Sequence, residues 1–414
     1  MKWMGKSARA LAMTAALAIA GPAAAQNDTI KFGLLEDFTA VYTFATGEYN
    51  QGQRDYLTLV NGEGGVAGHQ VEAIIRDHGN QPQRGIEAYN RAREEGAVLV
   101  DFLSTPVSRA LVDQVIKDEV VMITALHGRG DASDGEAFPY VFPMMATYWS
   151  QATVLVKYLE DNGGLEGKKI ALVHIDSPFG KEPIPVLEDL AEQKKFELKT
   201  FAYPSPGNEQ SATWSEVRRY RPDHVFIWGA GGGQAVSVRE AIRNGIDPES
   251  ILSVVWLAET DVKNIGADVM VGVKRFEAVA SGTEPAVIAQ IMDKVVGAGK
   301  GAGETANVGS TYYNIGVASM AVAVEAARLA LENEGAPLTG PKLKAGFERI
   351  SGFDADGLMP AITVTAKDHQ GGGAGRVARW NGQAWEAVSD WGAAHQEVVQ
   401  KEIEAGAAAY KGGN

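Results

Sequence analysis

The feature that most restricts the fold of this chain is a repeated alternation of short apolar runs with longer amphipathic stretches, which begins at Thr29. Runs rich in β-branched residues predict strands over residues 30–35, 71–76, 98–103 and 120–124. Apolar residues three and four positions apart predict helices over residues 48–61, 83–95 and 108–116. This alternation is typical of a mostly parallel sheet with helices on both faces.

A second series of the same kind follows the first. It predicts helices over residues 147–160, 181–195, 211–219 and 233–244. It predicts strands over residues 169–175, 198–203, 224–228 and 251–257. After it we expect helices over residues 285–297, 310–332 and 342–350 and a closing pair of strands at 376–380 and 384–388. These last helices exceed the needs of the second lobe. We therefore expect an α/β protein with two doubly wound parallel-sheet lobes, the first of which the chain returns to complete.

The first 25 residues have the pattern of a cleavable signal peptide. Lys2, Lys6 and Arg9 precede an apolar stretch that ends at Ala20, and small residues lead to an expected mature start at Gln26. The alternative, a membrane anchor, needs roughly 20 apolar residues. No later segment is expected to cross a membrane. The pattern therefore predicts an exported protein in a bacterial periplasm.

Charge and cysteine content restrict the partners. The chain has 38 basic and 52 acidic residues, and loss of three basic residues with the signal peptide lowers the formal net charge from −14 to −17. Such a surface is unsuited to nucleic acid. The sequence contains no cysteine, which excludes a lipid anchor and indicates a stable core without disulfides.

Motifs of enzymes and cofactor sites are missing. The glycine run 297–302 follows a predicted helix, and the run 229–233 is followed by Gln234 where a dinucleotide fingerprint needs glycine. No Walker lysine, HExxH or GxSxG pattern occurs, and the seven histidines have no metal-ligand spacing. We expect a non-enzymatic protein with no cofactor and no metal.

The ends of the predicted strands mark the expected site. In open α/β sheets, ligands bind beyond the carboxyl ends of the strands. The segments at those ends are 104–105, 126–129, 176–180, 229–233 and 258–260. If two lobes face each other with these ends, the five segments line one cleft.

In several long stretches the chain resembles the periplasmic substrate-binding proteins of branched-chain amino acid ABC transporters. These stretches are IKFGLL, LTLVNGEGGVAGHQVEAIIRDHGNQPQRGIEAYNRA, VDFLSTPVSRALVDQVIKDEVVMITA, KIALVHIDSPFGKEPIPVLEDL and RPDHVFIWGAGGGQAVSVREAIRNGI. Their order and spacing carry the resemblance over nearly all of the mature chain. It implies a type I binding fold with a hinge of three crossings, lobes of 28–146 plus 280–372 and of 147–279 plus 373–414, a monomer, and delivery of the ligand to an inner-membrane permease.

The resemblance also assigns site residues. It implies that main-chain amides and hydroxyls at Ser104, Thr105 and 124–128 hold the carboxylate of an amino acid. Phe179 would cover the ligand from the second lobe. An acid near Ala258 or Glu259 would meet the ligand ammonium, and the alternative for Glu259 is a solvated loop position.

This chain departs from the family at three of these positions, one of which is the displaced acid near Ala258 or Glu259. It has Leu126-His127-Gly128-Arg129 where relatives have small residues, and it has glycines around Gly231 where relatives commonly have tyrosine. A lost ring and an added, potentially cationic pair suggest a roomier cleft for a more anionic ligand, such as an aromatic acid. A periplasmic sensor of the same fold is a further alternative.

Several assignments stay open between a ligand contact and a structural role. His127 either donates to a carboxylate or has a structural role. For Arg129 an ion pair with Asp131 or Asp134 is favoured over a ligand contact. Of Tyr42 and Phe44, which follow the first strand, Phe44 is the preferred ligand contact. Trp256 lies inside a predicted strand, which favours core packing.

Overall fold

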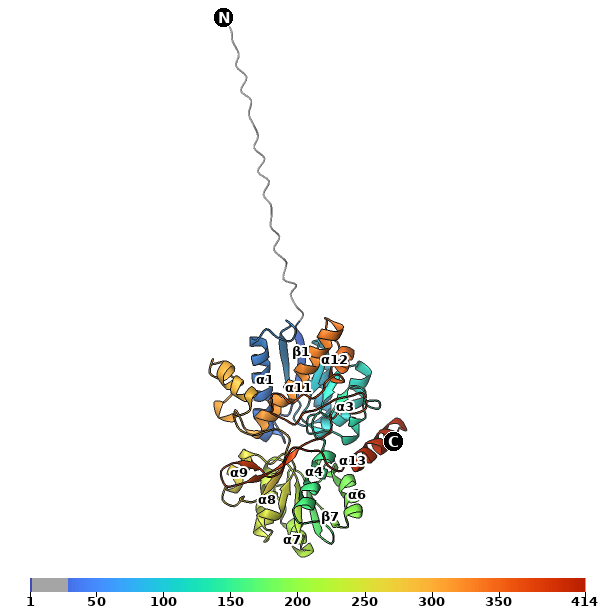
Figure 1. The fold of residues 1–414 in the computed structure, drawn as a ribbon, viewed down its shortest axis with the longest axis vertical. Helices are drawn as coiled ribbons and strands as arrows, with labels where there is room; N and C mark the ends of the chain where they lie inside the picture. Colours follow the sequence, from blue (N-terminus) through green and yellow to red (C-terminus); the bar gives the residue numbers. More distant parts are fainter. Residues whose placement is uncertain (2–28, 414) are drawn as a thin grey trace.

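The computed structural model describes Met1 and residues 29–413, which form two α/β lobes (Figure 1). The predicted signal peptide, residues 1–25, lies outside the described residues except for Met1. The sheet of the first lobe is parallel, with the order β2-β1-β3-β4-β5. Its strands are β1 (Ile30–Glu36), β2 (Val71–Asp77), β3 (Leu99–Asp101), β4 (Val121–Ile123) and β5 (Val141–Phe142).

The second lobe contains a seven-stranded sheet with the order β12-β11-β10-β9-β8-β6-β7. The strands are β6 (Lys169–Ile175), β7 (Glu197–Tyr203), β8 (His224–Trp228), β9 (Ile251–Ser253), β10 (Lys274–Glu277), β11 (Arg376–Trp380) and β12 (Trp385–Ala387). Strands β6 to β10 pair in parallel, and β11 and β12 extend the sheet by antiparallel pairing. The expected α/β class with two parallel-sheet lobes is confirmed.

The helices cover both sheets (Figure 1). Those of the first lobe are α1 (Thr43–Gly62), α2 (Pro82–Glu94), α3 (Thr105–Asp118), α10 (Ala286–Ile291), α11 (Thr311–Glu334) and α12 (Gly340–Phe347). Those of the second lobe are α4 (Tyr148–Asp161), α5 (Pro178–Lys181), α6 (Ile184–Lys194), α7 (Ser211–Tyr220), α8 (Gly231–Arg243) and α9 (Glu259–Ile265). The last helix, α13 (Gln396–Lys411), lies at the side of the molecule where the lobes meet.

The sequence pattern missed some boundaries and elements. The predicted strand 251–257 is wrong beyond Ser253, where β9 ends. The predicted helix 181–195 begins too early: α6 starts at Ile184, after Pro183, and the short helix α5 that ends at Lys181 was not expected. Strands β5 and β10 and helices α9 and α13 were not expected; β5 has only two residues and β10 carries three charged side chains.

Helix α11 is the central helix of the first lobe. It is long and apolar enough to cross a membrane, against the expectation from the sequence, but 83% of its most apolar window is buried inside the protein. It packs most extensively against α1, and the backbones of the two helices are in contact. A Cβ added at Gly52 would lie 2.1 Å from the Tyr313 carbonyl oxygen, and one added at Gly316 would lie 2.1 Å from the Tyr49 carbonyl oxygen. Segments more than 250 residues apart are thus joined in one core.

The lobes touch along the side where α13 lies. The first half of α13 packs its apolar side chains with those of the second-lobe core, and Ala407 near its end belongs to a core cluster of the first lobe. Tyr410 stacks on Phe138 of the first lobe with ring centroids 4.4 Å apart. The lobe boundaries given above from the resemblance stay a prediction.

The close approach of α1 and α11 predicts opposite effects for two glycines of the same helix. Gly52→Ala forces the backbones apart and should lower the free energy of unfolding by about 1–3 kcal/mol. Gly47→Ala is the matched control, because no atom lies within 4 Å of an added Cβ there. It should be neutral or stabilising by up to about 1 kcal/mol. Urea unfolding of both variants measures the difference, and equal effects would contradict the close packing.

Candidate ligand-binding site

A cavity lies where the carboxyl ends of the first-lobe strands face the second lobe. The strand order reverses between β1 and β3, which is the point at which open α/β sheets bind ligands. The walls come from the segments after β1, β3, β4 and β9 and from the start of α4. They consist of Tyr42, Phe44, Ala45, Leu103, Thr105, His127, Tyr148 and Trp256. No wall residue carries a carboxylate, a lysine or an arginine.

Aromatic rings form most of these walls. Phe44 packs edge-on against Tyr312 with centroids 5.6 Å apart, and Trp256 lies 6.1 Å from the same ring. The indole N–H of Trp256 donates to the Tyr148 hydroxyl at 2.8 Å, which fixes both side chains. The space between the walls is about 10 Å³, room for about one water molecule. A larger ligand therefore enters only if the walls separate.

His127 is the most unusual polar group of the cavity. Its ring is 3% exposed, and Nδ1 lies 3.0 Å from the Ala125 carbonyl oxygen. Burial lowers the pKa of His127 to about 4, so the ring is neutral at neutral pH. This result corrects the expectation of a cationic group at this position.

Arg129 is also not available to a ligand in this conformation. Its Nε and Nη2 atoms each lie 2.5 Å from a carboxylate oxygen of Asp131, and the guanidinium stacks on Phe138. The favoured interpretation, an ion pair with Asp131, is confirmed. With His127 neutral and Arg129 paired, the argument from a cationic pair to a more anionic ligand loses its basis.

Two main-chain amides near the cavity are already bonded to side chains. The N–H of Val107 donates to Ser104 Oγ at 3.3 Å, and the N–H of Gly128 donates to Thr105 Oγ1 at 3.1 Å. Ser104 thus caps α3, and it also donates to the Asn80 side chain at 2.7 Å. Of the residues expected to hold a carboxylate, Thr105 and His127 line the cavity. Ser104 and the fully buried Leu126 do not.

The expected second-lobe residues stand behind the walls. Phe179 is 2% exposed and packs against the Tyr148 ring at 5.0 Å. Gly231 begins α8 at a φ of +58°, and a Cβ there would lie 2.6 Å from the Phe44 ring. Glu259 Oε1 accepts from the Thr311 hydroxyl at 2.9 Å. None of the three lines the cavity, and their contact with a ligand stays a prediction.

Sequence reasoning missed two of the aromatic walls. Trp256 was assigned to the core of a strand, but β9 ends at Ser253 and Trp256 lies in the segment that follows. Tyr148 opens α4 and was not considered. Its signal was its place at the second position of the predicted helix 147–160, where the chain passes from the first lobe to the second. Tyr42 lines the cavity together with the preferred Phe44.

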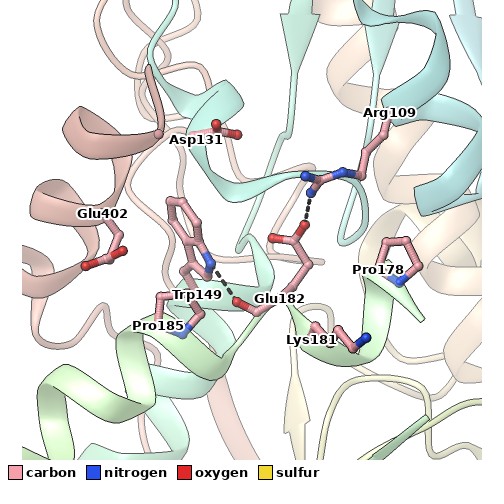
Figure 2. Close-up of a pocket in the computed structure, with 9 residues that line it drawn as sticks. Arg109, Asp131, Trp149, Pro178, Lys181, Glu182, Pro185 and Glu402 are labelled. Atoms are coloured by element: carbon pink, nitrogen blue, oxygen red, sulfur yellow. Dashed lines mark hydrogen bonds and ion pairs between the residues drawn. The ribbon is translucent and has the colours of Figure 1, made fainter. Parts of the chain in front are cut away.

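A second, larger hollow of about 310 Å³ lies outside the cleft, between the two lobes and α13 (Figure 2). Arg109 of α3 reaches across it and forms an ion pair with Glu182, which lies between α5 and α6 (Figure 2). The Trp149 indole N–H donates to the Glu182 carbonyl oxygen at 2.7 Å. Burial raises the pKa of the Glu182 carboxyl to about 7 in spite of the attraction of Arg109. We call the Arg109–Glu182 ion pair the clasp, because it joins the two lobes. The aromatic cavity is the better candidate for the ligand.

The comparison with protein families decides the classification. The model of the protein family described as periplasmic binding protein matches residues 29–384 of this chain. The chain belongs to the periplasmic binding protein family. Its fold is that of the type I periplasmic binding proteins.

Individual members of the periplasmic binding protein family agree with this assignment. The leucine-, isoleucine-, valine-, threonine- and alanine-binding protein of Pseudomonas aeruginosa is 22% identical over 236 residues, which are 56% of this chain and 63% of that protein. The chain thus spans less than two thirds of the curated relatives that it matches, 63% and 65%.

Solved structures match more of the chain. One titled as an ABC transporter permease from the Pseudomonas fluorescens group is 34% identical, with a TM-score of 0.86, and covers 92% of this chain and 97% of its own. A branched-chain amino acid ABC transporter protein from Thermus thermophilus with bound valine has a TM-score of 0.79 at 18% identity, with 91% and 99% coverage. The second likeness shows the fold alone.

The clasp predicts a change in the balance of open and closed forms. Arg109→Gln removes the ion pair and should raise the open-to-closed ratio of the ligand-free protein by about two- to fivefold, the worth of one partly exposed pair. Fluorescence energy transfer between dyes on the two lobes measures this ratio. Arg328→Gln is the matched control, because Arg328 pairs only within α11, with Glu325 and Glu332. Equal shifts in both variants would contradict the clasp.

The neutral His127 predicts a pH dependence of stability. Its folded-state pKa is about 4 and the usual value is 6.5, so the unfolded chain binds the extra proton between these values. Stability from this residue is complete above pH 6.5 and is lost as the pH falls towards 4. Wild type should lose about 2 kcal/mol more than His127→Gln between pH 7.5 and pH 5. Urea titrations at both pH values test this, and parallel losses would contradict a buried neutral ring.

Proposed function

We propose that this protein is the periplasmic solute-binding component of an ABC importer. It captures a small organic ligand between its lobes and delivers it unchanged to an inner-membrane permease. Family membership and the place of the cavity support this role. We further propose that residues 1–25 are its signal peptide, that it acts as a monomer, and that it neither uses a cofactor nor binds nucleic acid.

The walls of the cavity support a cargo with an aromatic or other apolar body. Four aromatic side chains line it, and none of the eight wall residues is ionised at neutral pH. This composition is the observation that carries the proposal, because rings bind rings and apolar groups well. The walls fit the aromatic body of such a cargo; within this class we propose an aromatic carboxylic acid, whose carboxylate needs partners from outside the eight wall residues.

A branched-chain or related amino acid is the second candidate. The named ligands of the P. aeruginosa relative favour it. An amino acid brings an ammonium group, which is costly to bury without an opposite charge. The acid expected at that position, Glu259, accepts hydrogen bonds from both the main-chain N–H and the hydroxyl of Thr311. The second candidate therefore needs a rearrangement of α9 that the first does not.

Capture requires a hinge motion, because the cavity is smaller than any such cargo. Contacts across the cleft, such as that of Phe44 with Gly231, break when the lobes part. A ligand then favours closure only through contacts that it makes in the closed form and not in the open one. The ring of Trp256 from the second lobe and that of Phe44 from the first can make such contacts together.

A thermal-shift screen tests the role and the cargo class together. Benzoate and 4-hydroxybenzoate should raise the melting temperature of the mature protein, since a ligand that binds only the folded form stabilises it, and leucine and valine should not. The cargo should be recovered unchanged after incubation. Stabilisation by leucine or valine alone would overturn the aromatic cargo and favour the amino acid.

Variants locate the binding in the cavity. Trp256→Leu should weaken binding of the aromatic acid by about tenfold or more, because it removes part of the closing ring surface. Trp391→Leu is the control, since Trp391 stacks on Arg376 far from these walls. Calorimetric titration measures both. Reconstitution of this protein in vesicles with the permease encoded beside its gene separates an importer from a periplasmic sensor, because only an importer supports ligand uptake.

A further inference from the structure

His127, one of the wall residues of the aromatic cavity, has one bonded and one unbonded ring nitrogen. Its Nδ1 lies 3.0 Å from the Ala125 carbonyl oxygen. A carbonyl oxygen can only accept, so Nδ1 carries the proton. Nε2 is fully buried and has no hydrogen-bond partner among the described residues. A buried nitrogen with a free lone pair costs free energy until a donor reaches it.

The surroundings keep this ring in the same neutral form. Burial is the main cause of the low pKa of His127, and the neighbouring His78 adds to it. The other titratable groups that face the cavity are the hydroxyls of Tyr42 and Tyr148, and the pKa of each is raised far above neutral. At neutral pH, nothing on the walls supplies a negative charge that would stabilise a second proton on the ring.

We propose that the ligand donates a hydrogen bond to Nε2 of His127 through an uncharged hydroxyl or amide N–H group on its apolar body. The inference rests on the proposed function, because it concerns the ligand of the same cavity. It makes His127 a specificity-determining residue for the hydrogen-bond donor group of the cargo.

Other ligand groups fit Nε2 less well. A carboxylate offers only lone pairs, so it can meet Nε2 only if the ring takes up a proton on binding. An ammonium group can donate, but it would be buried among walls without a negative charge. A phenol-like hydroxyl supplies the missing proton without a charge. The predicted cargo is therefore an aromatic acid or related compound with a hydroxyl or amide donor on its ring.

Imidazole ¹⁵N–¹H correlation spectra at pH 7.5 test the first step without any ligand. The expected spectrum has His127 protonated at Nδ1 and not at Nε2, with its signals assigned by their loss in His127→Leu. His174→Leu is the matched control, since His174 is equally buried and its Nδ1 also lies 3.0 Å from a main-chain carbonyl oxygen, that of Ile175. Protonation at Nε2, or a doubly protonated ring, overturns the inference.

Calorimetry with 4-hydroxybenzoate and 4-fluorobenzoate tests the second step, because fluorine is close to a hydroxyl in size but has no proton to donate. The hydroxyl compound should bind about tenfold tighter, the worth of one good hydrogen bond. The preference should vanish in His127→Leu and persist in His174→Leu. Binding should take up no proton, as measured in buffers of different ionisation enthalpy.

The outcomes separate this inference from the proposed function. A preference that persists in His127→Leu, or uptake of one proton per benzoate bound, overturns the inference and leaves the aromatic cargo standing. If neither aromatic acid binds and leucine or valine does, the aromatic cargo and the inference fail together, and the solute-binding role stands. If none of these compounds binds, the proposed cargo classes fail, and the inference fails with them.

Discussion

The packing of α11 on α1 is the contact on which the two-lobed form depends. At Gly52 and Gly316 the helices approach so closely that no side chain fits between them, and the Tyr313 hydroxyl donates to the Asp55 carboxylate at 2.8 Å. Because this contact returns a late part of the chain to the first lobe, the second lobe is inserted between two parts of the first. The chain then returns to the second lobe in β11 and β12, so it passes between the lobes more than once, and a hinge between them stays a prediction.

The parallel sheets then decide where a ligand can bind. All parallel strands of a doubly wound sheet end at the same edge. The segments after β1, β3 and β4 therefore meet at one place, whatever side chains they carry. The fold fixes position and leaves chemistry to the loops. In this chain the walls supply aromatic rings, the hydroxyls of Tyr42, Thr105 and Tyr148, and one neutral imidazole. Of the charged residues nearby, Arg129 is paired with Asp131 and Glu259 is bonded to Thr311.

The regular elements could be predicted because their periodicities are local. The strands 30–35 and 169–175 agree with β1 and β6 within one residue at each end. The site could be predicted only in part, since strand ends locate the loops but do not say which side chain of a loop faces the cavity. Phe179 and Tyr148 show the limit: both are rings near the cleft, and only their packing, with Phe179 behind Tyr148, makes one a wall and the other its support.

The charge state of a residue could not be predicted from the sequence, for a different reason. The letters at His127 and Arg129 suggest positive charge, but the ionisation of His127 is set by its burial, and the availability of Arg129 is set by the Asp131 carboxylate two residues on. Neither burial nor pairing can be read from a loop of unknown path. The expectation of a cationic pair available to a ligand at His127 and Arg129 was therefore wrong.

The clasp and the cavity contribute to closure in different ways. Arg109 and Glu182 attract each other across the lobes, yet burial raises the pKa of Glu182 to about 7, so the cost of desolvating its carboxylate exceeds that attraction. The ion pair therefore orients the closed form more than it holds it. A stronger clasp would close the protein without cargo, and in the proposed importer the permease would then meet loaded and empty protein in the same shape. Closure must then depend on what the ligand adds between Phe44 and Trp256, which makes the aromatic cavity, and not the larger hollow, the part of the molecule that senses its cargo.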